Sequence, residues 1–503
     1  MAELNRRNFI KAAGGAVAVI AAAGAARASA VVPDKWDVET DILVVGAGVA
    51  GLFAAVSAKE NGAERVLLID KNATPFLNAS SFSAGMVVGS GTKAQAAAGI
   101  KDENGKAEFV EEYLKGGRGT GRRELVEVLA REAPAALDWM TDRGVKLIPV
   151  VSTAFRVNRQ YYVDTNSGSR YVKILYEEGR KLGVEYRMNT KALELVTTPD
   201  GSQVLGLKAE TKGKPLAIRA DRIIMCTGGF AANTAMLDDN LLSFRGILST
   251  AAVCSVGEGL KMVRRIGGDT THLDQATLVA YGLPTDEKKR RALIWHGHKM
   301  GQYGTITLGE DGRRFIRDEA EYTDVALAMA QLGFKKVFQI ATDAQLKDFM
   351  AHDDIQVIGW GRERFEEELR DRKLFVKKAD TIEDLAVQMG LPADAVAATV
   401  RAYNSYVDAG RDKEFDRKYI KGDFRTGPYW GFICRPLVSL TMGGVRIDPR
   451  LHVLDVYGNP IKGLYAAGEI VGGIHGSCYI GGGSVGSSLT FGKFAGKVAA
   501  TEA

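Results

Sequence analysis

The sequence predicts an α/β chain in which a parallel-sheet domain is split into two segments and an α+β domain is inserted between them. Three observations support this fold class. Residues 41–71 combine a strand, a glycine turn, a helix and a second strand, and a further glycine-rich segment lies near the other end of the chain, at residues 463–496. Between them, residues 379–410 have the pattern of two amphipathic helices, with Pro392 opening the second.

The composition is that of a globular protein with more than one domain. The chain has 503 residues, of which 46% are hydrophobic and 25% charged, and this length exceeds that of one ordinary core. The net charge of +5 is small, and lysines and arginines are mostly mixed with acids. Because no basic tract or nucleic-acid motif accompanies this charge, we expect no nucleic-acid partner.

The N-terminus has the order of an export signal. A basic start, "NRRNFIK" at residues 5–11, precedes an apolar alanine-rich stretch at residues 12–26 and a small-x-small "ASA" at residues 28–30. The paired arginines resemble the twin-arginine signal, so we expect residues 1–30 to be removed and the mature protein to work in the periplasm. The alternatives are a membrane anchor or a chance alanine-rich helix. After signal removal we expect no stable membrane span.

The cysteines and histidines suggest no metal centre. Cys226, Cys254, Cys434 and Cys478 form no C-x-x-C pair, and the six histidines are scattered along the chain. This spacing argues against a zinc ribbon, an iron–sulfur cluster or covalently attached haem. We therefore predict no metal site.

The segment "DILVVGAGVAGLFAAVSAKENGAERVLLIDK" predicts dinucleotide binding. Gly46 permits a tight turn, Gly48 lets the backbone approach a pyrophosphate, and Gly51 lets the helix and strand pack closely. The helix N-terminus then favours negative charge at the phosphates. Asp70 ends the second strand at the spacing of a carboxylate that holds ribose hydroxyls. The alternative is a purely structural glycine turn.

Three later segments favour FAD over NAD by resemblance. "ASSFSAGMV" at residues 79–87, "DRIIMCTGGFAAN" at residues 221–233 and "GLYAAGEIVGG" at residues 463–473 resemble flavin-contact segments of the fumarate reductase/succinate dehydrogenase flavoprotein family. The resemblance implies a Rossmann-type FAD-binding domain at residues 36–275 and 441–503. It also implies an α+β substrate-capping domain at residues 276–440, with the active site at the domain interface.

The same resemblance assigns the cofactor contacts. Residues 80–85 would line the isoalloxazine, Glu469 would bind the ribityl or adjacent ribose region, and a helix starting at Gly486 would face the N1–C2=O edge. The covalent subgroup carries a histidine in the segment that matches residues 78–83; none occurs here, so FAD should be non-covalent. The predicted FAD-binding residues are Gly46, Gly48, Ala50, Gly51, Asp70, Lys71, Ser80, Ser81, Ala84, Gly85, Ala192, Thr227, Gly228, Gly229, Gly468, Glu469, Ser487, Ser488 and Leu489.

Compared with the carboxylate-reducing members, the sequence lacks an anion clamp. Fumarate reductases hold a dicarboxylate with arginine and histidine, because carboxylates need fixed positive partners. The family's "HGANRLGG" segment is here "HGSCYIGG", with Tyr479 in place of the arginine. Leu440 stands where histidine commonly precedes "TMGG", residues 275–281 hold no histidine, and the expected proton-donating arginine falls near Leu346. We therefore do not expect fumarate or succinate as substrate.

The late glycine segment resembles that of the 3-ketosteroid dehydrogenases instead. "SCYIGGGSVGSSLTFG" places Tyr479 and Gly483 at the positions of that motif, and "GRRFIRDEAEY" supplies Tyr322. The resemblance also implies a supporting tyrosine in "NRQYYVD", which is Tyr162 or its neighbour Tyr161.

The chemistry that these residues imply is coherent. The Tyr479 hydroxyl and the Gly483 N–H would polarise a substrate carbonyl. Tyr322 would remove a proton, while hydride would pass from the neighbouring carbon to flavin N5. In the opposite direction the same groups would reduce a C=C bond conjugated to a carbonyl. We therefore predict an FAD-dependent oxidoreductase that interconverts C–C and C=C bonds next to the neutral carbonyl of a ketone or enone.

Two other functions stay open at this point. One is reduction of a small unsaturated acid, with Arg245 or Arg291 as the cationic group. The other is non-catalytic electron transfer by a flavoprotein. Since the chain has no haem or FMN module of its own, we expect a separate electron carrier, such as a cytochrome or a quinone-linked partner. The sequence leaves open the substrate, the direction and the oligomeric state.

Overall fold

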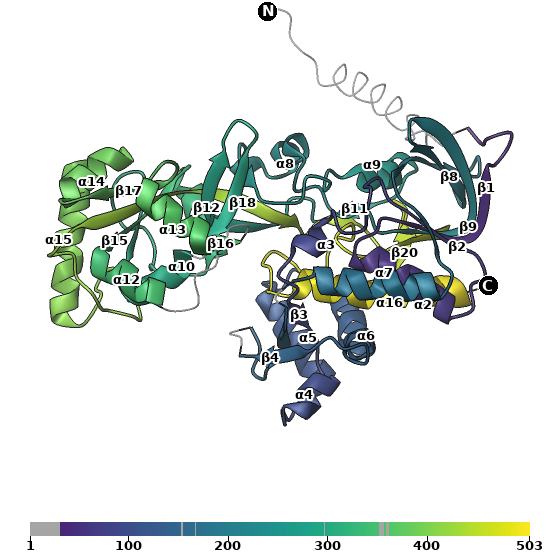
Figure 1. Cartoon of the computed structure of the whole chain (residues 1–503), viewed down its shortest axis with the longest axis horizontal. Helices are drawn as coiled ribbons and strands as arrows, with labels where there is room; N and C mark the ends of the chain where they lie inside the picture. Colours follow the sequence, from purple (N-terminus) through teal and green to yellow (C-terminus); the bar gives the residue numbers. More distant parts are fainter. Residues whose placement is uncertain are drawn as a thin grey trace, which may run out of the picture.

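The computed structural model describes residues 31–502 except 152–153, 166, 296, 352–356 and 359–361. Figure 1 shows an elongated molecule, with one large β-sheet and its helices at one end and a second sheet region at the other. A smaller region of helices and short strands lies beside the first sheet. The predicted export signal, residues 1–30, lies outside the described residues.

The first sheet joins strands from both ends of the chain. Its strands are β1 (Val38–Val45), β2 (Val66–Ile69), β6 (Glu185–Arg187), β7 (Thr190–Thr197), β8 (Val204–Thr211), β9 (Lys214–Met225), β20 (His452–Leu454) and β21 (Pro460–Ala466). The order is β20-β21-β9-β1-β2-β6, and the β7–β8 hairpin joins through β9. Strand β1 is parallel to β2 and β9, and β21 is parallel to β9. A late strand thus completes a sheet that begins near residue 38, as the split α/β fold predicts.

Two long helices hold the ends of the chain together. Helix α2 (Val49–Glu60) follows the first glycine turn, and α16 (Gly483–Thr501) ends the chain. An ideal Cβ on Gly492 or Gly496 would lie 2.3 or 2.1 Å from the carbonyl oxygens of Ala50 and Ala54, respectively. These glycines are therefore required, because the backbones of the two helices touch. Figure 1 shows α2, α7 (Ser169–Lys181) and α16 together on one face of the sheet.

The start of α16 differs from the sequence prediction. Helix formation begins at Gly483 rather than at Gly486, because Gly482 adopts a left-handed conformation with φ +83° and begins the turn. Gly483, the last residue of the glycine run 481–483, is therefore already the first residue of the helix. This places the N–H groups of residues 483–485 at the helix N-terminus.

The second sheet is built mainly from the middle of the chain. Its strands are β10 (Leu248–Ser249), β12 (Ala276–Asp286), β13 (Arg291–Trp295), β14 (Ile306–Leu308), β15 (Val337–Thr342), β16 (Val357–Ile358), β17 (Val376–Ala379) and β18 (Tyr429–Thr441). The order is β10-β13-β12-β18-β15-β14, with β16 on β13 and β17 on β18. Strand β10 belongs to this sheet although it precedes residue 276.

Helices cover the second sheet region. They are α10 (Gly297–Met300), α11 (Tyr322–Leu332), α12 (Asp343–Ala351), α13 (Arg362–Asp371), α14 (Ile382–Met389) and α15 (Ala393–Ala409), with the 3-10 helix η2 (Gly301–Tyr303). The two amphipathic helices predicted within residues 379–410 are confirmed as α14 and α15, with Pro392 as the N-cap of the second.

A third, smaller sheet lies against the N-terminal end of α16. It has the order β3-β5-β4, and its strands are β3 (Val87–Val88), β4 (Leu147–Val150) and β5 (Gln160–Val163). The accompanying helices are α4 (Lys93–Ala97), α5 (Gly105–Gly116) and α6 (Arg123–Thr141). The remaining elements are α3 (Ala79–Phe82), α8 (Thr234–Asn240), η1 (Leu242–Phe244), α9 (Glu258–Arg265), β11 (Thr270–Thr271) and β19 (Gly444–Val445).

A buried ionic network fixes the segment between β14 and α11. The Asp318 carboxylate accepts hydrogen bonds from Arg314 at 2.7 Å, Arg417 at 3.0 Å and the Thr307 N–H at 2.7 Å. Arg314 also donates to Asp412 at 2.6 Å. The four ionised side chains are at most 1% exposed. The network holds the chain that leads into Tyr322, and Arg314 is one of its buried ion-pair residues.

Removing one buried charge from this network should destabilise the protein strongly. We expect Asp318→Asn to lower the free energy of unfolding by ~3–5 kcal/mol, because two buried guanidinium groups lose a charged partner. Asp408→Asn is the matched control, since Asp408 is 64% exposed in its pair with Arg425 and exposed pairs contribute less than about 1 kcal/mol. Urea unfolding measures both, and equal losses would contradict the prediction.

Candidate active site

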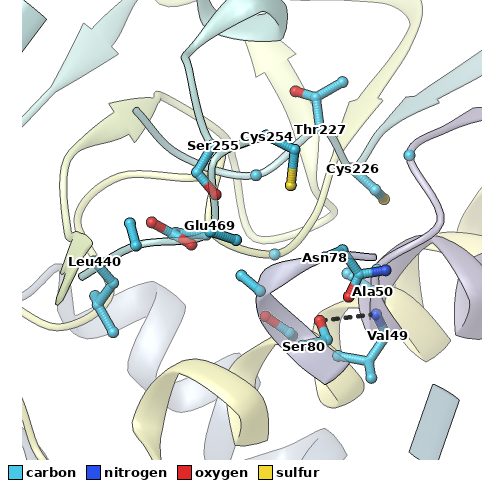
Figure 2. A pocket seen from close by; sticks show the side chains of 18 of the residues that line it. Val49, Ala50, Asn78, Ser80, Cys226, Thr227, Cys254, Ser255, Leu440 and Glu469 are labelled. Atoms are coloured by element: carbon cyan, nitrogen blue, oxygen red, sulfur yellow. Dashed lines mark hydrogen bonds between the residues drawn. The ribbon is translucent and has the colours of Figure 1, made fainter. Parts of the chain in front are cut away.

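A cavity of about 350 Å³ runs between the first glycine turn and the second sheet region. Figure 2 shows Leu440 beside Glu469 on one side of it, and Ser80 bonded to the Val49 N–H on another. Of the residues predicted to bind FAD, those that line the cavity are Gly46, Gly48, Ala50, Asp70, Lys71, Ser80, Ala84, Ala192, Thr227, Gly228, Gly468, Glu469 and Ser488.

The remaining predicted FAD residues lie behind the cavity wall. They are Gly51, Ser81, Gly85, Gly229, Ser487 and Leu489. An ideal Cβ on Gly51 would lie 1.9 Å from the Gly46 carbonyl oxygen, which is the close helix–strand packing that the motif predicts. The Ser487 hydroxyl donates to the Ser484 carbonyl at 3.2 Å. Their direct contact with FAD stays a prediction.

The first glycine turn has the geometry of a phosphate-binding turn. Gly46 has φ +111°, and its ideal Cβ would lie 2.3 Å from the Cys226 carbonyl oxygen, so only glycine fits. Gly48 precedes α2 and has an ordinary extended conformation. The N–H groups of the first turn of α2 face the cavity end where phosphate charge would be favoured.

Asp70 lies at the ribose end of the cavity. Its two carboxylate oxygens accept hydrogen bonds from the Ala47 N–H and the Asn72 N–H, each at 2.7 Å. Burial raises the pKa of Asp70, while these two backbone bonds favour its charged form. Beside it, Lys71 forms an ion pair with Glu258 and donates to the Cys254 carbonyl at 2.9 Å. This end of the cavity is polar and charged.

The central wall can accommodate a ribityl chain. Glu469 accepts hydrogen bonds from the Thr441 N–H at 3.0 Å and from the Thr441 hydroxyl at 3.2 Å. Burial raises the pKa of Glu469. Gly228 has φ +75°, and an ideal Cβ there meets open space. The phosphate-binding turn, the ribose carboxylate and this open polar wall fit FAD, which would supply hydride transfer when bound.

Beyond Glu469, which lies beside Leu440 in Figure 2, the cavity wall near Tyr479 has hydroxyl groups and apolar side chains. These come from Tyr479, Leu440 and Ile294, together with Ser439 and Ser484. Among the described residues that line the cavity, the cationic side chains are Lys71 and Lys191, and both contact Glu258 at the ribose end. No arginine or histidine of the described chain is in the wall, which agrees with the loss of the anion clamp.

Tyr479 presents its hydroxyl at the N-terminus of α16. The hydroxyl oxygen accepts a hydrogen bond from the Ser484 N–H at 3.3 Å. Burial raises the pKa of Tyr479 to about 12, so the hydroxyl keeps its proton at neutral pH. A neutral phenol at a helix N-terminus can donate to a carbonyl oxygen, and the helix end favours negative charge developing on that oxygen.

Tyr322 is the first residue of α11 and lies near Tyr479 without lining the cavity itself. Burial raises the pKa of Tyr322, and the nearby Tyr479 and Glu321 raise it further. Its ring packs against a small apolar cluster of the second sheet that includes Leu248 and Leu437. The structure therefore brings the two predicted catalytic tyrosines together from different regions.

The Gly483 N–H has a partner within the turn. It donates to the Ile480 carbonyl at 2.9 Å. An ideal Cβ on Gly483 would lie 2.5 Å from the Tyr113 hydroxyl oxygen and 3.2 Å from His475 Nδ1, so close packing already requires glycine here. In this structure the N–H is not free to bind a substrate carbonyl, whereas the Ser484 N–H points to the Tyr479 hydroxyl. The substrate contact predicted for Gly483 stays a prediction.

The two tyrosines of "NRQYYVD" lie on opposite faces of β5. Tyr161 is fully buried, with its hydroxyl 2.9 Å from the Thr92 hydroxyl and donating to the Gly89 carbonyl at 3.0 Å. Tyr162 is 39% exposed, and neither lines the cavity. The supporting role predicted for Tyr162 or Tyr161 therefore stays a prediction.

Sequence reasoning missed several wall residues. Ser484 and Val485 line the cavity because α16 starts early, and the glycine motif could have indicated them. Thr250, Ala251 and Ile294 come from the second sheet region and belong to no recognisable motif. Only the three-dimensional pairing of β10 with β13 places them at the cavity.

Comparison with known proteins defines the class. Residues 41–485 match the family described as the FAD binding domain, to which this chain belongs. It is a member of the fumarate reductase/succinate dehydrogenase flavoprotein group, and its cofactor is FAD.

Individual relatives refine this membership. The chain is 31% identical to the probable fumarate reductase Ifc3 of Shewanella frigidimarina, over 92% of this chain and 75% of the relative. It is 29% identical to the acrylate reductase flavoprotein subunit of Shewanella woodyi, over 98% of both chains.

Solved structures agree on the fold. The open conformation of a flavocytochrome c3 fumarate reductase superposes with a TM-score of 0.76 at 29% identity, covering 97% of this chain and 80% of that one. A 3-ketosteroid-Δ4-(5α)-dehydrogenase from Rhodococcus jostii RHA1 superposes with a TM-score of 0.75 at 24% identity, covering 94% and 99%.

These comparisons establish the reaction type. The protein is an FAD-dependent oxidoreductase that acts on C–C and C=C bonds. Within the described residues, none of the helices combines the length and apolar character needed to cross a bilayer. The same part of the chain contains no group of three or more metal-binding side chains placed to hold an ion.

A side chain at Gly48 should block FAD without unfolding the protein. The backbone there, at φ −69° and ψ 173°, suits any residue, but a Cβ would lie 3.3 Å from Ser80 Oγ at the cavity wall. Overpacking costs ~1–3 kcal/mol, so we expect Gly48→Val to weaken FAD binding about ten- to hundredfold. Titration of the apoprotein with FAD measures this. Ala107→Val, on the exposed face of α5, should leave the affinity unchanged.

Proposed function

We propose that this enzyme interconverts C–C and C=C bonds adjacent to a neutral carbonyl, with a ketone or enone as substrate. The observation that carries the proposal is a described cavity wall without arginine or histidine, in which Tyr479 offers a hydroxyl group and Leu440 and Ile294 are apolar. Two carboxylates in such a place would lack positive partners, and burying them would be costly. A carbonyl oxygen needs only hydrogen-bond donors.

The two arginines considered for an unsaturated acid are engaged elsewhere. Arg291 donates to the Ala251 carbonyl at 2.7 Å, and Arg245 donates to the Asp238 carbonyl at 3.2 Å. Neither lines the cavity. The similarity to fumarate and acrylate reductases nevertheless keeps a small unsaturated acid as the second candidate, which the experiment below distinguishes.

The roles of the tyrosines follow from their protonation. Tyr479 donates a hydrogen bond to the carbonyl oxygen and stabilises enolate character there. Tyr322 transfers a proton at the carbon next to that carbonyl, as acid in C=C reduction and as base in dehydrogenation. Burial keeps both hydroxyl groups protonated at neutral pH. Tyr322 can therefore donate a proton in the reductive direction without first acquiring one.

The proposal also includes the domain arrangement, the electron carrier and the site of action of the enzyme. We assign residues 276–440 as a cap over the FAD-binding segments 36–275 and 441–503, because β13 and β18 contribute Ile294 and Leu440 to the cavity. Electrons would be exchanged with a separate carrier, a cytochrome or a quinone-linked partner. The FAD would be non-covalent, and the twin-arginine-like N-terminus supports export to the periplasm.

Flavin absorbance under anaerobic conditions tests the substrate class. Dithionite-reduced enzyme should be reoxidised by enones and steroid dienones, or oxidised enzyme bleached by 3-ketosteroids, whereas fumarate should have no effect. Tyr322→Phe should retain FAD and lose about 10²–10⁴-fold in rate. Tyr457→Phe, an exposed tyrosine, is the matched control and should keep the wild-type rate.

Three outcomes would contradict the proposal. Rapid reoxidation by fumarate would establish the second candidate and an anion clamp elsewhere. A reducible flavin without turnover of any of these compounds, together with a stable cytochrome complex, would indicate an electron-transfer flavoprotein. Full activity of Tyr322→Phe would remove that residue from the chemistry.

The two directions should differ in pH dependence. Burial raises the pKa of Tyr322, so the protonated form that reduction needs is complete from about pH 6 to about pH 9. Reduction should therefore be flat over this range, while dehydrogenation, which needs the ionised form, should rise about tenfold per pH unit. Stopped-flow flavin traces measure both, and a reduction rate that falls as pH rises through 7 would be inconsistent with this assignment.

A further inference from the structure

We propose that Gln160 is a positioning residue, which holds the Gly481–Gly483 turn so that Tyr479 and the N-terminus of α16 face the cavity. The inference rests on the proposed function for the role of Tyr479. Neither the glycine motif nor the tyrosine pattern of "NRQYYVD" indicates a role for Gln160. The role is inferred from its hydrogen bond to the Gly481 carbonyl.

Gln160 contacts the turn directly. Its side-chain amide donates a hydrogen bond to the Gly481 carbonyl oxygen, which links positions 321 residues apart in the sequence. An ideal Cβ on Gly481 would lie 3.1 Å from Gln160 Nε2, so the amide lies closely against this glycine. Gln160 is buried, with 7% of the residue exposed, whereas Gly481 is partly exposed, so the amide is the buried partner of this bond.

The strand that carries Gln160 is anchored at its neighbours on both sides. The Arg159 side chain is fully buried and forms ion pairs with Asp102, Glu108 and Glu112. Tyr161, also fully buried, donates to the Gly89 carbonyl. Because side chains alternate along a strand, Arg159 and Tyr161 fix one face of β5 and leave Gln160 on the other. The backbone that carries the Gln160 amide is thus held in place on both sides.

The turn rests on the same small sheet. Gln160 pairs with Val88 of β3. An ideal Cβ on Gly482 would lie 2.9 Å from the Val87 carbonyl oxygen, and one on Gly486 2.9 Å from the Val88 N atom. The glycines therefore let α16 sit on the backbone of β3, and the bond from Gln160 fixes the position of Gly481 along it.

The held turn presents the catalytic hydroxyl. The Gly483 N–H donates to Ile480 within the turn, and the Ser484 N–H donates to the Tyr479 hydroxyl oxygen. Without the bond from Gln160, Gly481 could shift, and both of these hydrogen bonds would be disturbed. The Tyr479 hydroxyl would then be less well aligned with the substrate carbonyl. Gln160 thus acts on the reaction only through Tyr479.

The role of the Gln160 amide as a hydrogen-bond donor can be tested with a side chain that donates only when it is protonated. Glutamine donates from its NH₂ group at any pH, whereas glutamate donates only when protonated. An ionised carboxylate facing the Gly481 carbonyl would repel it, and burial raises the pKa of such a carboxyl group. Gln160→Glu should therefore hold the turn at low pH and release it as the pH rises.

The first experiment is the pH dependence of the reductive rate in FAD-loaded protein, with an enone that reoxidises the reduced wild-type flavin. Gln160→Glu should be close to wild type at about pH 5 and fall at least tenfold by about pH 8, while Gln160→Leu should be slow throughout. Gln345→Glu is the matched control, because Gln345 is also buried and donates to a glycine carbonyl, that of Gly304, at 3.1 Å in the second sheet region. It should show no such fall.

The second experiment needs no substrate. Hydrogen–deuterium exchange in the FAD-loaded protein should become at least tenfold faster in the peptide covering residues 477–489 in Gln160→Leu, and stay unchanged there in Gln345→Leu. Unchanged exchange in Gln160→Leu would overturn the inference, as would a pH profile shared by Gln160→Glu and Gln345→Glu. Faster exchange without turnover of any ketone or enone by wild type would refute the proposed function and leave the positioning role intact.

Discussion

The structure depends on close backbone contact at the first glycine turn and along α2. Gly51 lies against the Gly46 carbonyl, and Gly492 and Gly496 let α16 lie against α2 without intervening side chains. A β-carbon at Gly51 would push α2 away from the glycine turn, and one at Gly492 or Gly496 would push α16 away from α2. Because α16 also carries the residues that follow Tyr479, this contact places the catalytic end of the cavity in register with its phosphate end.

A second constraint is the distribution of charged side chains along the cavity. Its ribose end has a carboxylate, two lysines and a glutamate, whereas the wall near Tyr479 has the Glu469 carboxyl, hydroxyl groups and aliphatic side chains. The ribose end can thus hold a charged dinucleotide. Because the fold is shared with a fumarate reductase, a difference in substrate within the family would come from a few side chains at fixed backbone positions.

The parts that could be predicted from sequence are those encoded locally. The spacing of Gly46, Gly48 and Gly51 predicts the turn. Gly46 meets the backbone of Cys226 and Gly51 meets the carbonyl of Gly46, whereas Gly48 lies against the Ser80 side chain. The helices α14 and α15 follow from their amphipathic pattern. The predicted start of α16 at Gly486 was wrong, because a run of glycines is compatible with a loop as well as with the first turn of a helix. Gln160 and Ile294 were missed because their contacts join segments that are distant in the chain.

The late position of β21 and α16 has a consequence for biogenesis. A ribosome releases the turn around Gly46 early, yet β21 must reach β9 and α16 must reach α2 before the cavity has all its walls. The cavity is therefore complete only after the C-terminal segment has been synthesised. A chain stopped before β21 would leave the edge of β9 and one face of α2 uncovered, and such exposed edges and apolar faces promote aggregation and chaperone binding.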